Sequence, residues 1–406
     1  MKMKKVTSLL AMTVAAVMAM TGCGGNDAAD DSAGNKVYHI GIIQQMEHGS
    51  LDQATKGFED KLTELLGEDN VEFDYQNAQG EQANCTTIST KFVSDGCDLI
   101  MANATTALQT AAAATSDIPI VGTSVTDYVT AGVVESNEAP GKNVTGVSDL
   151  ASVEKQIDVL MQFCDKENTK VAVVYCSAEP NSTYQADLAK KYLDEQKIPY
   201  AIYTAADSNE IQAVVTKAVA DCNAMYIPTD NTFANNMEIV KNIAVPARVP
   251  TVTGAEAMCE VGALATLSIS YYDLGAKAAE MAYDILVNGK KPAEMPIEYL
   301  TDGLVPKYNA DIAEDQKADA VAQMVEMTQR AEQEVAIETL LASKGFQDAV
   351  VSLTEESADV VVDVADLSDA KRAQIEDIVT RKAEVNAANV VITPIHESTN
   401  TSESGD

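Results

Sequence analysis

Short apolar runs alternate with helical stretches along most of this chain, and the alternation starts a second time after residue 147. Val37–Gln45 has the length and residue types of a buried strand, and Ser50–Leu66 has apolar residues at helical spacing. Strands that alternate with helices form a parallel sheet with crossover helices. The pattern therefore predicts an α/β protein with two lobes, each built on a parallel sheet, and a cleft between them.

The remaining predicted elements follow the same rhythm. In the first series we expect strands over 71–75, 98–103 and 118–122 and helices over 81–94 and 106–115. In the second series we expect helices over 152–163, 183–195, 209–220 and 232–244 and strands over 170–175, 200–203, 224–227, 250–253 and 263–269. A helix over 274–287 is expected to return to the first lobe. The first lobe then comprises 37–147 and about 271–296, the second comprises 148–270 and about 297–306, and the crossings predict a hinge.

Residues 1–22 have the order of an export signal, with three lysines in Met1–Lys5, the apolar run Val6–Met20 and then Cys23 after small residues. The apolar run is short for a membrane span. The segment resembles a bacterial lipobox, which implies a mature chain that begins at Cys23 with a diacylglycerol on its thiol. With residues 23–36 as a tether, we expect a lipid-anchored protein on the outer face of the cell membrane. Secretion with a free Cys23 thiol is the alternative.

The formal net charge of −34 argues against nucleic acid as a partner, because phosphate neutralisation requires Lys and Arg. The six cysteines other than Cys23 are scattered without CxxC spacing, so we expect no zinc site and favour free thiols over disulfides. The chain has three histidines and lacks the HExxH, GxSxG and Gly-rich phosphate-loop motifs. We therefore expect neither a metal nor a cofactor.

Five ordered segments resemble a single family. They are Glu47–Asp52, Gly122–Asp127, Asn143–Asp149, Tyr226–Thr232 and Tyr271–Gly275. Residues 37 to about 312 resemble the type 1 periplasmic-binding-protein fold, and more narrowly the ABC-transporter substrate-binding family that includes tryptophan and tyrosine binders. The resemblance implies a protein that is not an enzyme, holds a small molecule such as an aromatic amino acid between its lobes, and delivers it to an ABC permease. A sugar-responsive repressor shares the fold, but the export signal argues against that function.

Ligands of open α/β sheets bind beyond the carboxyl ends of the strands, so the loops after the predicted strands hold the candidate residues. The candidate ligand-binding residues are His48, Ser50, Leu51, Asp52, Asn103, Thr105, Ser124, Val125, Thr126, Asp127, Ser177, Asn181, Ser182, Thr229, Asp230, Asn231, Glu256 and Ser270. Their hydroxyl, amide and acidic groups suit a small polar ligand.

An α-amino acid needs two opposite complements. Hydroxyls at helix N-termini suit its carboxylate, and Ser50, Thr105 and Ser182 are placed to offer them. Acidic side chains suit its ammonium group, and Asp127 and Asp230 are the candidates. Simpler alternatives exist: Ser50 and Ser182 each precede a glutamine by three residues, as in a capping box, and Asp230 suits a turn. The two acids could also be a general acid and base, but no nucleophile accompanies them.

One segment departs from the family pattern. Relatives often have Gly-Ile-Asp-Tyr where this chain has Ser268–Tyr271. The neutral Ser270 removes one partner for an ammonium group, and Glu256 faces either the cleft rim or water. The ligand is therefore an amino acid or another small polar or aromatic acid.

The chain continues beyond the segment at which this family usually stops. A helix over Ala318–Lys344, ended by Gly345, precedes strands over 349–352 and 360–364, a helix over 368–382 and a strand over 388–393. This αββαβ order resembles the C-terminal domain of stage III sporulation protein AH, a ring-building motif. The matching segments are Leu340–Val351, Ala358–Asp363, Ala373–Lys382 and Asn389–Pro394.

The second resemblance covers about 318–395 and implies ring-like self-association or a partner in the space between mother cell and forespore. A structural component of a sporulation-associated ring or envelope complex is therefore our alternative function. An α+β appendage that shares only the fold is the other interpretation. We assign 313–345 to a helix and linker, 346–396 to this domain and 397–406 to a disordered polar tail.

Overall fold

The computed structural model describes residues 36–165, 167–300, 305–308, 329–330, 333–346, 349–354, 357–363, 367–383 and 385–395. The predicted export signal, the lipidation site Cys23, residues 318–328 of the predicted helix and the tail over 397–406 lie outside these residues. Within the described ranges, no helix combines the length and the apolar character needed to cross a membrane. The predicted fold class is confirmed, because two parallel-sheet lobes are followed by a small α+β domain.

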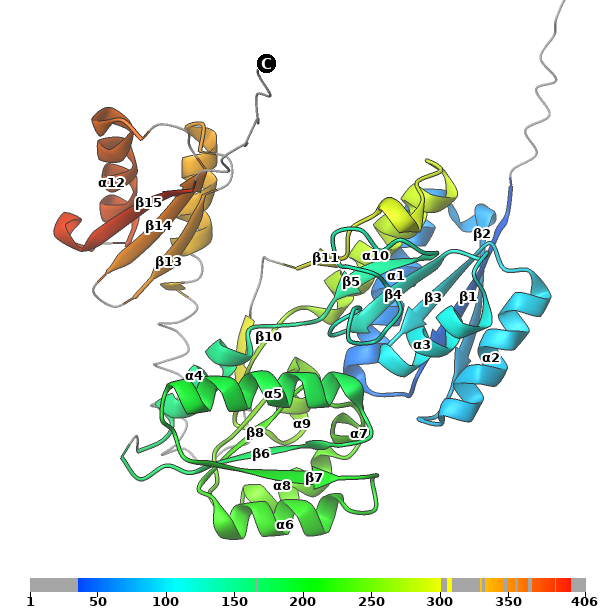
Figure 1. The fold of residues 1–406 in the computed structure, drawn as a ribbon, viewed down its shortest axis with the longest axis horizontal. Coiled ribbons are helices and arrows are strands. Elements are labelled where there is room, and N and C mark those ends of the chain that lie inside the picture. Colours follow the sequence, from blue (N-terminus) through cyan, green and yellow to red (C-terminus); the bar gives the residue numbers. More distant parts are fainter. Residues whose placement is uncertain are drawn as a thin grey trace, which may run out of the picture. The chain divides into compact units, whose positions relative to one another are not determined.

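The first lobe is built on a six-stranded parallel sheet with the strand order β11-β5-β4-β3-β1-β2 (Figure 1). Its strands are β1 (Tyr38–Gln44), β2 (Val71–Asn77), β3 (Leu99–Asn103), β4 (Ile120–Val125), β5 (Val144–Ser148) and β11 (Glu298–Tyr299). Its helices are α1 (Gly49–Leu66), α2 (Gln82–Asp95), α3 (Thr105–Ala114) and α10 (Tyr271–Leu286). Every residue of β3, β4 and β5 is buried, as expected for a parallel sheet with both faces covered.

The helices of this lobe cover the sheet in two pairs. On one face, Phe58 of α1 packs in the same cluster as Ile40 of β1 and Leu274 of α10. On the other face, α2 and α3 pack against the sheet through a separate cluster. Helices α1 and α10 approach each other very closely, because a Cβ added at Gly275 would lie 1.9 Å from the carbonyl oxygen of Ala54. Glycine is therefore required at this crossing.

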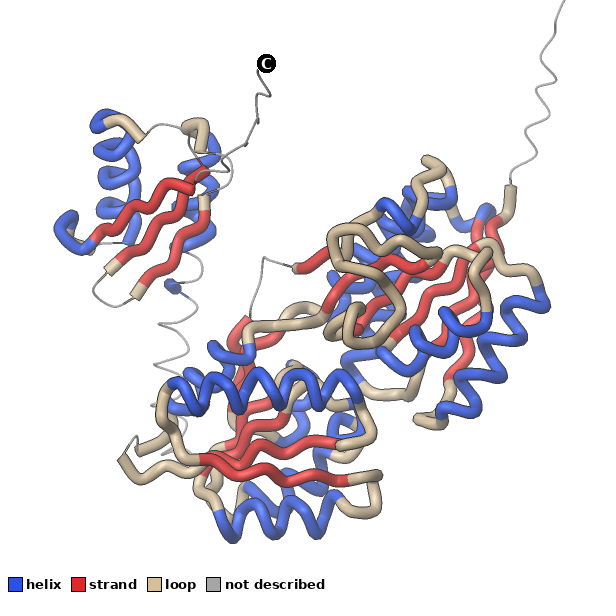
Figure 2. The backbone as a smooth tube through the Cα atoms, in the orientation of Figure 1, coloured by secondary structure: helices blue, strands red, loops and turns tan. Residues whose placement is uncertain are grey.

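The second lobe repeats the arrangement with the strand order β12-β10-β9-β8-β6-β7, in which only β12 is antiparallel. Its strands are β6 (Val171–Cys176), β7 (Tyr200–Ala205), β8 (Ala224–Ile227), β9 (Thr251–Thr253), β10 (Ala265–Ser268) and β12 (Val305–Tyr308). Its helices are α4 (Val153–Gln162), α5 (Pro180–Glu195), α6 (Ile211–Asp221), α7 (Asn231–Ala234), α8 (Met237–Ala244) and α9 (Glu256–Gly262). Figure 2 shows helices on both faces of this sheet, with α4 and α5 on one side and α6 on the other.

The chain passes between the lobes three times: after β5, after β10 and between β11 and β12. Because β11 pairs with β5, Glu298 and Tyr299 belong to the first lobe. Our assignment of about 297–306 to the second lobe is wrong for these two residues. It is right for the strand that follows, since β12 pairs with β10. A chain that passes several times between two lobes is expected to form a hinge there.

The C-terminal domain has the predicted αββαβ order. A helix over 333–343 is followed by β13 (Val350–Leu353), β14 (Ala358–Asp363), α12 (Asp369–Ala383) and β15 (Val390–Ile395). The sheet order is β13-β14-β15, and residues alternate between buried and exposed along β13. Both helices contribute to one core cluster under the buried face. The predicted helix end is confirmed, because Gly345 has φ +97° and the Phe346 amide donates to the Leu341 carbonyl.

Most of the described cysteines are buried. The six described cysteines form no disulfide; they are Cys85, Cys97, Cys164, Cys176, Cys222 and Cys259. Burial raises the pKa of Cys85 and Cys164 to about 11. These side chains therefore act as small core groups rather than as reactive thiols.

Candidate functional site

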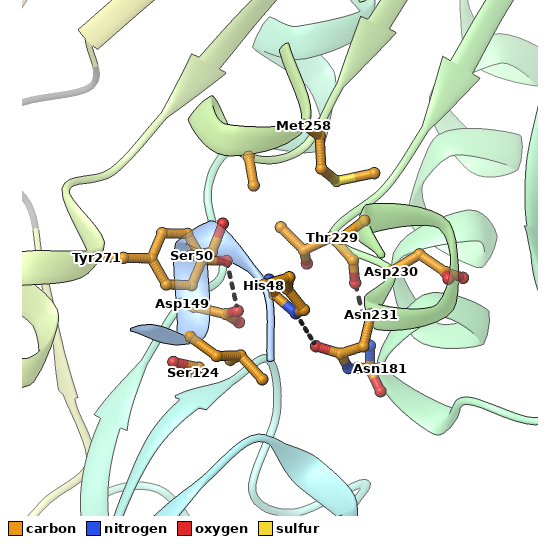
Figure 3. A pocket seen from close by; sticks show the side chains of 13 residues that line it. His48, Ser50, Ser124, Asp149, Asn181, Thr229, Asp230, Asn231, Met258 and Tyr271 are labelled. Atoms are coloured by element: carbon orange, nitrogen blue, oxygen red, sulfur yellow. Dashed lines mark hydrogen bonds between the residues drawn. The ribbon is translucent and has the colours of Figure 1, made fainter. Parts of the chain in front are cut away.

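A cavity lies between the carboxyl ends of the two parallel sheets (Figure 3). About 290 Å³ of space between the atoms lies in this region, part of it open to solvent. The lining residues are His48, Ser50, Leu51, Ser124, Asp149, Asn181, Thr229, Asp230, Asn231, Ala234, Ala255, Met258 and Tyr271. Both lobes therefore contribute to its wall, as the predicted cleft requires.

The start of α1 forms one side of the cavity. His48 is the N-cap residue, with an extended backbone (φ −163°, ψ 160°) and no side-chain capping bond. Ser50 lies in the first turn of α1, and its hydroxyl is buried without a hydrogen-bond partner. The predicted capping box at Ser50 is therefore wrong, and so is the one at Ser182, because Ser182 lies inside α5 behind the N-cap Glu179. The Ser50 hydroxyl remains available to a ligand beside the positive end of α1.

Two strand ends near the cavity have strained backbone. Ser124, the fifth residue of β4, has φ +55°, and Ala104, directly after β3, has φ +90°. Residues other than glycine rarely adopt such angles, and they persist where the surrounding structure imposes them. The Ser124 hydroxyl is buried and has no partner, so the strained position places a second unpaired hydroxyl on the cavity wall.

Asp149 brings a buried carboxylate to the cavity at the point where the chain first leaves the first lobe. Its Oδ2 accepts from the Tyr271 hydroxyl at 2.9 Å and its Oδ1 from the Thr126 hydroxyl at 3.0 Å. Burial raises the pKa of Asp149. The backbone amide of Asp149 also donates to this carboxylate, and because no Lys or Arg lines the cavity, the carboxylate has no counter-ion among the lining residues.

The second lobe contributes two further buried acids. Asp230 is the N-cap of α7 and accepts from the backbone amides of Cys176 at 2.6 Å and Phe233 at 2.8 Å. Glu179 accepts from the backbone amides of Asn231 and Thr232. Burial and the neighbouring Glu179 raise the pKa of Asp230. The Asp230 carboxylate thus orders the loop before α7. The same residue also lines the cavity, so it stabilises a turn and lies at the cleft.

Two side-chain hydrogen bonds join the lobes beside the cavity. His48 Nε2 lies 3.1 Å from Asn231 Oδ1, and Gln185 Nε2 donates to the Thr126 hydroxyl at 3.0 Å. Burial lowers the pKa of His48. These two hydrogen bonds connect the walls that the two lobes contribute to the cavity.

Eight of the predicted residues line the cavity. They are His48, Ser50, Leu51, Ser124, Asn181, Thr229, Asp230 and Asn231. Thr105 and Asp127 line a smaller neighbouring pocket together with Asn181 and Tyr184. The Asp127 carboxylate accepts from the Thr130 amide at 2.6 Å.

The other predicted residues lie outside the lining of both pockets. Several have structural hydrogen bonds: Asn103 donates to the Leu51 carbonyl, Thr126 donates to Asp149, Asp52 accepts from Gln44, Ser177 donates to the Ala205 carbonyl and Ser270 caps α10. Val125 and Ser182 are fully buried, and Glu256 is the half-buried first residue of α9. Their roles in binding remain predictions.

Five lining residues are absent from the predicted set: Asp149, Ala234, Ala255, Met258 and Tyr271. A signal existed for two of them, because Asp149 and Tyr271 end and begin segments that carry the family resemblance. The other three are small or apolar residues on short helices and their N-caps, and such residues are more often core. Figure 3 shows Met258 at the end of the cavity opposite Ser124. The wall therefore has an apolar end and a polar end, and among the described residues no cluster of His, Cys, Asp or Glu is placed to hold a metal.

Comparison with known families gives two matches. Residues 39–327 match the family described as ABC transporter substrate binding protein. Residues 308–392 match the family described as SpoIIIAH-like protein. The two matches overlap over residues 308–327, and outside this overlap the two-lobed body and the C-terminal domain each correspond to one family.

Individual relatives agree with the first match. A tyrosine-binding protein of Clostridioides difficile is 37% identical over 309 residues, which is 74% of this chain and 89% of that protein. The crystal structure of an ABC domain in complex with L-Trp from Streptococcus pneumonia has 32% identity and a TM-score of 0.66 over 70% of this chain and 95% of that one. A ligand-free, open substrate-binding protein with adhesive properties from Clostridium difficile has 29% identity and a TM-score of 0.52, over 89% of this chain and 100% of that one.

Proposed function

This chain belongs to the ABC transporter substrate-binding protein family, and from that premise we propose that its cavity binds an aromatic L-amino acid for delivery to an ABC importer. The observation that carries the proposal is a cavity with a buried, cation-free carboxylate and two unpaired hydroxyls at one end and apolar side chains at the other. A zwitterionic head group with a large apolar side chain complements both ends.

Asp149 is our assignment for the ammonium group. A buried carboxylate without a counter-ion is costly, and a ligand cation relieves that cost. Asp149 fits this role better than Asp230, whose two oxygens already accept from backbone amides. It also fits better than Asp127, which lies in the smaller pocket. The predicted pairing of the ammonium with Asp127 or Asp230 is therefore replaced by one with Asp149.

Ser50 and Ser124 are our assignment for the ligand carboxylate. Both hydroxyls are buried and unpaired, so each can donate to an anion. Ser50 also lies in the first turn of α1, where unpaired backbone amides and the helix dipole favour negative charge. The carboxylate would thus be bound by neutral donors, which agrees with the lack of Lys and Arg in the lining.

The side chain of the ligand would occupy the end formed by Met258 and Ala255. Both residues are buried, and Met258 can adapt to a flat ring because its thioether is flexible and polarisable. The tyrosine-binding relative and the relative solved with L-Trp support an aromatic side chain at this position. Tyr271 lies at the polar end, where its hydroxyl donates to Asp149.

Ligand titrations of the mature chain test this proposal. We expect L-tryptophan, L-tyrosine or L-phenylalanine to raise the melting temperature, and at a concentration of about 100 Kd the added stability is about 2.7 kcal/mol. L-alanine and L-lysine are matched controls, since each has the same head group without an aromatic ring. Absence of a shift with every proteinogenic amino acid would refute the assignment. We also propose that Cys23 carries a lipid and that the protein lies on the outer face of the cell membrane. The mass of the membrane-bound protein tests whether the lipid is present.

For the C-terminal domain, assembly into a sporulation-associated ring or envelope complex is the second candidate function. Side chains of Glu338 and Glu334 accept from the Val351 and Leu353 amides, so one edge of its sheet is covered. On the open face Val350 is 60% exposed, and Val391 of the other edge strand is 53% exposed. These exposed valines favour a partner on that side. Sedimentation of the mature chain and of a chain ending at residue 312 tests this; equal, monomeric behaviour up to high concentration, with and without sporulation proteins, would count against it.

A further inference from the structure

Glu179 fixes the orientation of the Asn231 amide. Its carboxylate oxygens accept from Asn231 N at 3.0 Å, Asn231 Nδ2 at 2.8 Å, Thr232 N at 2.8 Å, Thr232 Oγ1 at 2.6 Å and Asn181 Nδ2 at 3.2 Å. Because the Asn231 group that donates to Glu179 is Nδ2, the NH₂ of this amide faces Glu179. The carbonyl oxygen of the same amide therefore points to His48.

This orientation determines the tautomer of His48. Its Nε2 lies 3.1 Å from Asn231 Oδ1, and because that oxygen can only accept, Nε2 must carry the proton. Burial lowers the pKa of His48, so the ring is neutral near pH 7 and Nδ1 has a lone pair. Nδ1 is buried and has no hydrogen-bond partner. A buried acceptor without a donor is costly, and His48 lines the cavity.

We propose that His48 couples ligand recognition to contact between the lobes: its Nε2–H donates to Asn231 of the second lobe while its Nδ1 accepts a hydrogen bond from an N–H or O–H group of the ligand. The inference rests on the proposed binding of an amino acid, and it gives His48 the role of a residue that positions the ligand and contributes to specificity. His48 precedes α1 and Asn231 begins α7, so one ring bridges the first turns of two helices in different lobes. The donor is either the ammonium group, which every amino acid has, or a side-chain phenol or indole group.

Two substitutions separate the two nitrogen atoms. In His48→Gln the amide nitrogen can take the place of Nε2 and keep the bond to Asn231, but no acceptor remains at Nδ1. In His48→Asn the amide oxygen can take the place of Nδ1, but the side chain is too short to reach Asn231. We expect His48→Gln to raise the Kd on the order of tenfold or more by calorimetry, and His48→Asn to recover part of that loss. His39→Gln is the matched control, because His39 is exposed and pairs with Glu72 outside the cavity.

The choice of ligand identifies the donor. An equal loss for L-tyrosine, L-tryptophan and L-phenylalanine in His48→Gln assigns the donor to the ammonium group. A loss for tyrosine and tryptophan alone assigns it to the side chain. An unchanged Kd for all three ligands would overturn the inference.

Imidazole ¹⁵N spectra of the unaltered protein give a test that does not depend on mutation. The chain has three histidines, so the His48 signals can be assigned with His39→Gln and a His396 variant. We expect a protonated Nε2 and an unprotonated Nδ1 without ligand, and a shift of the Nδ1 signal toward a hydrogen-bonded value on ligand addition. A proton on Nδ1, or a Nδ1 signal that ligand binding does not move, would overturn the inference. If no amino acid binds, the proposed function fails, but the spectrum of the free protein still tests the bond to Asn231.

Discussion

Replacing Asp149 by asparagine should weaken ligand binding without weakening the fold. The Asp149 carboxylate is buried and accepts from the Tyr271 and Thr126 hydroxyls at 2.9 and 3.0 Å. Asparagine has nearly the same size, keeps one acceptor oxygen and can donate to the second hydroxyl through its NH₂ group. The substitution therefore removes the negative charge and leaves the packing unchanged.

The expected loss of affinity follows from the ammonium contact. Hydrogen bonds to charged groups contribute about 1.5–3 kcal/mol, which corresponds to a Kd raised by a factor of roughly 10 to 150. The effect on stability has the opposite sign. Burial raises the pKa of Asp149 above its unfolded value, so its stabilising contribution is present at low pH and is lost as the pH rises through the folded-state pKa. At pH 7 the Asp149→Asn chain should therefore melt at the same temperature as the unaltered chain or at a higher one.

Calorimetric titration and thermal melting of the same samples test both parts. Tyr271→Phe is the matched control, since it removes one donor to Asp149 and keeps the charge. We expect this control to bind more weakly than the unaltered chain but more tightly than Asp149→Asn. An Asp149→Asn chain that binds the amino acid with unchanged Kd would refute the ammonium assignment. A variant that loses stability and binding together would show that Asp149 has a structural role only.

Three further results are expected. Because a bound ammonium favours ionised Asp149, ligand affinity should fall as the pH decreases through the raised pKa of this residue. Binding should also release protons, which calorimetry in buffers of different ionisation enthalpy measures. Proton uptake, or binding without any change in bound protons, would contradict this. Ser50→Ala and Ser124→Ala should each raise the Kd roughly fivefold, which corresponds to about 1 kcal/mol of binding free energy. The melting temperature should change little, because neither hydroxyl has a partner in the free protein, and a large loss of stability would contradict this. Gly275→Ala should lower the free energy of unfolding by about 1–3 kcal/mol in denaturant titrations, since the new Cβ would lie 1.9 Å from the Ala54 carbonyl oxygen; unchanged stability would contradict the close helix crossing.

The order of strands and helices could be predicted because buried parallel strands appear as continuous apolar runs. β3 and β6 are buried along their whole length, and the predicted ranges 98–103 and 170–175 match them to within one residue. β11 shows the limit of this reasoning. Its two residues, Glu298 and Tyr299, are exposed and have no apolar pattern, so only the pairing with β5 reveals which lobe contains them.

The site could be predicted in part, because its polar residues follow strands in sequence. His48, Ser124 and Asp230 were placed by that rule, and each lines the cavity. Asp149 follows β5 as well, but its contact with Tyr271 spans 122 residues and depends on the return of the chain to the first lobe. Capping at Ser50 was not predictable from spacing alone, since a helix that starts at Gly49 places the hydroxyl inside the first turn.

The buried acids of the site differ in the hydrogen-bond donors that surround them, so the number of acidic residues does not by itself identify the acid proposed to bind the ammonium group. Glu179 accepts from five donors, two of them backbone amides, and Asp230 accepts from two backbone amides. Backbone amides before a helix carry partial positive charge and compensate a carboxylate within the protein. The side chain of Asp149 accepts from hydroxyls that belong to Tyr271 and Thr126, and these have no helix dipole behind them. Of the three, Asp149 is the acid whose side-chain donors are hydroxyls rather than amides at a helix start, and on this ground we propose that a ligand ammonium group binds to it.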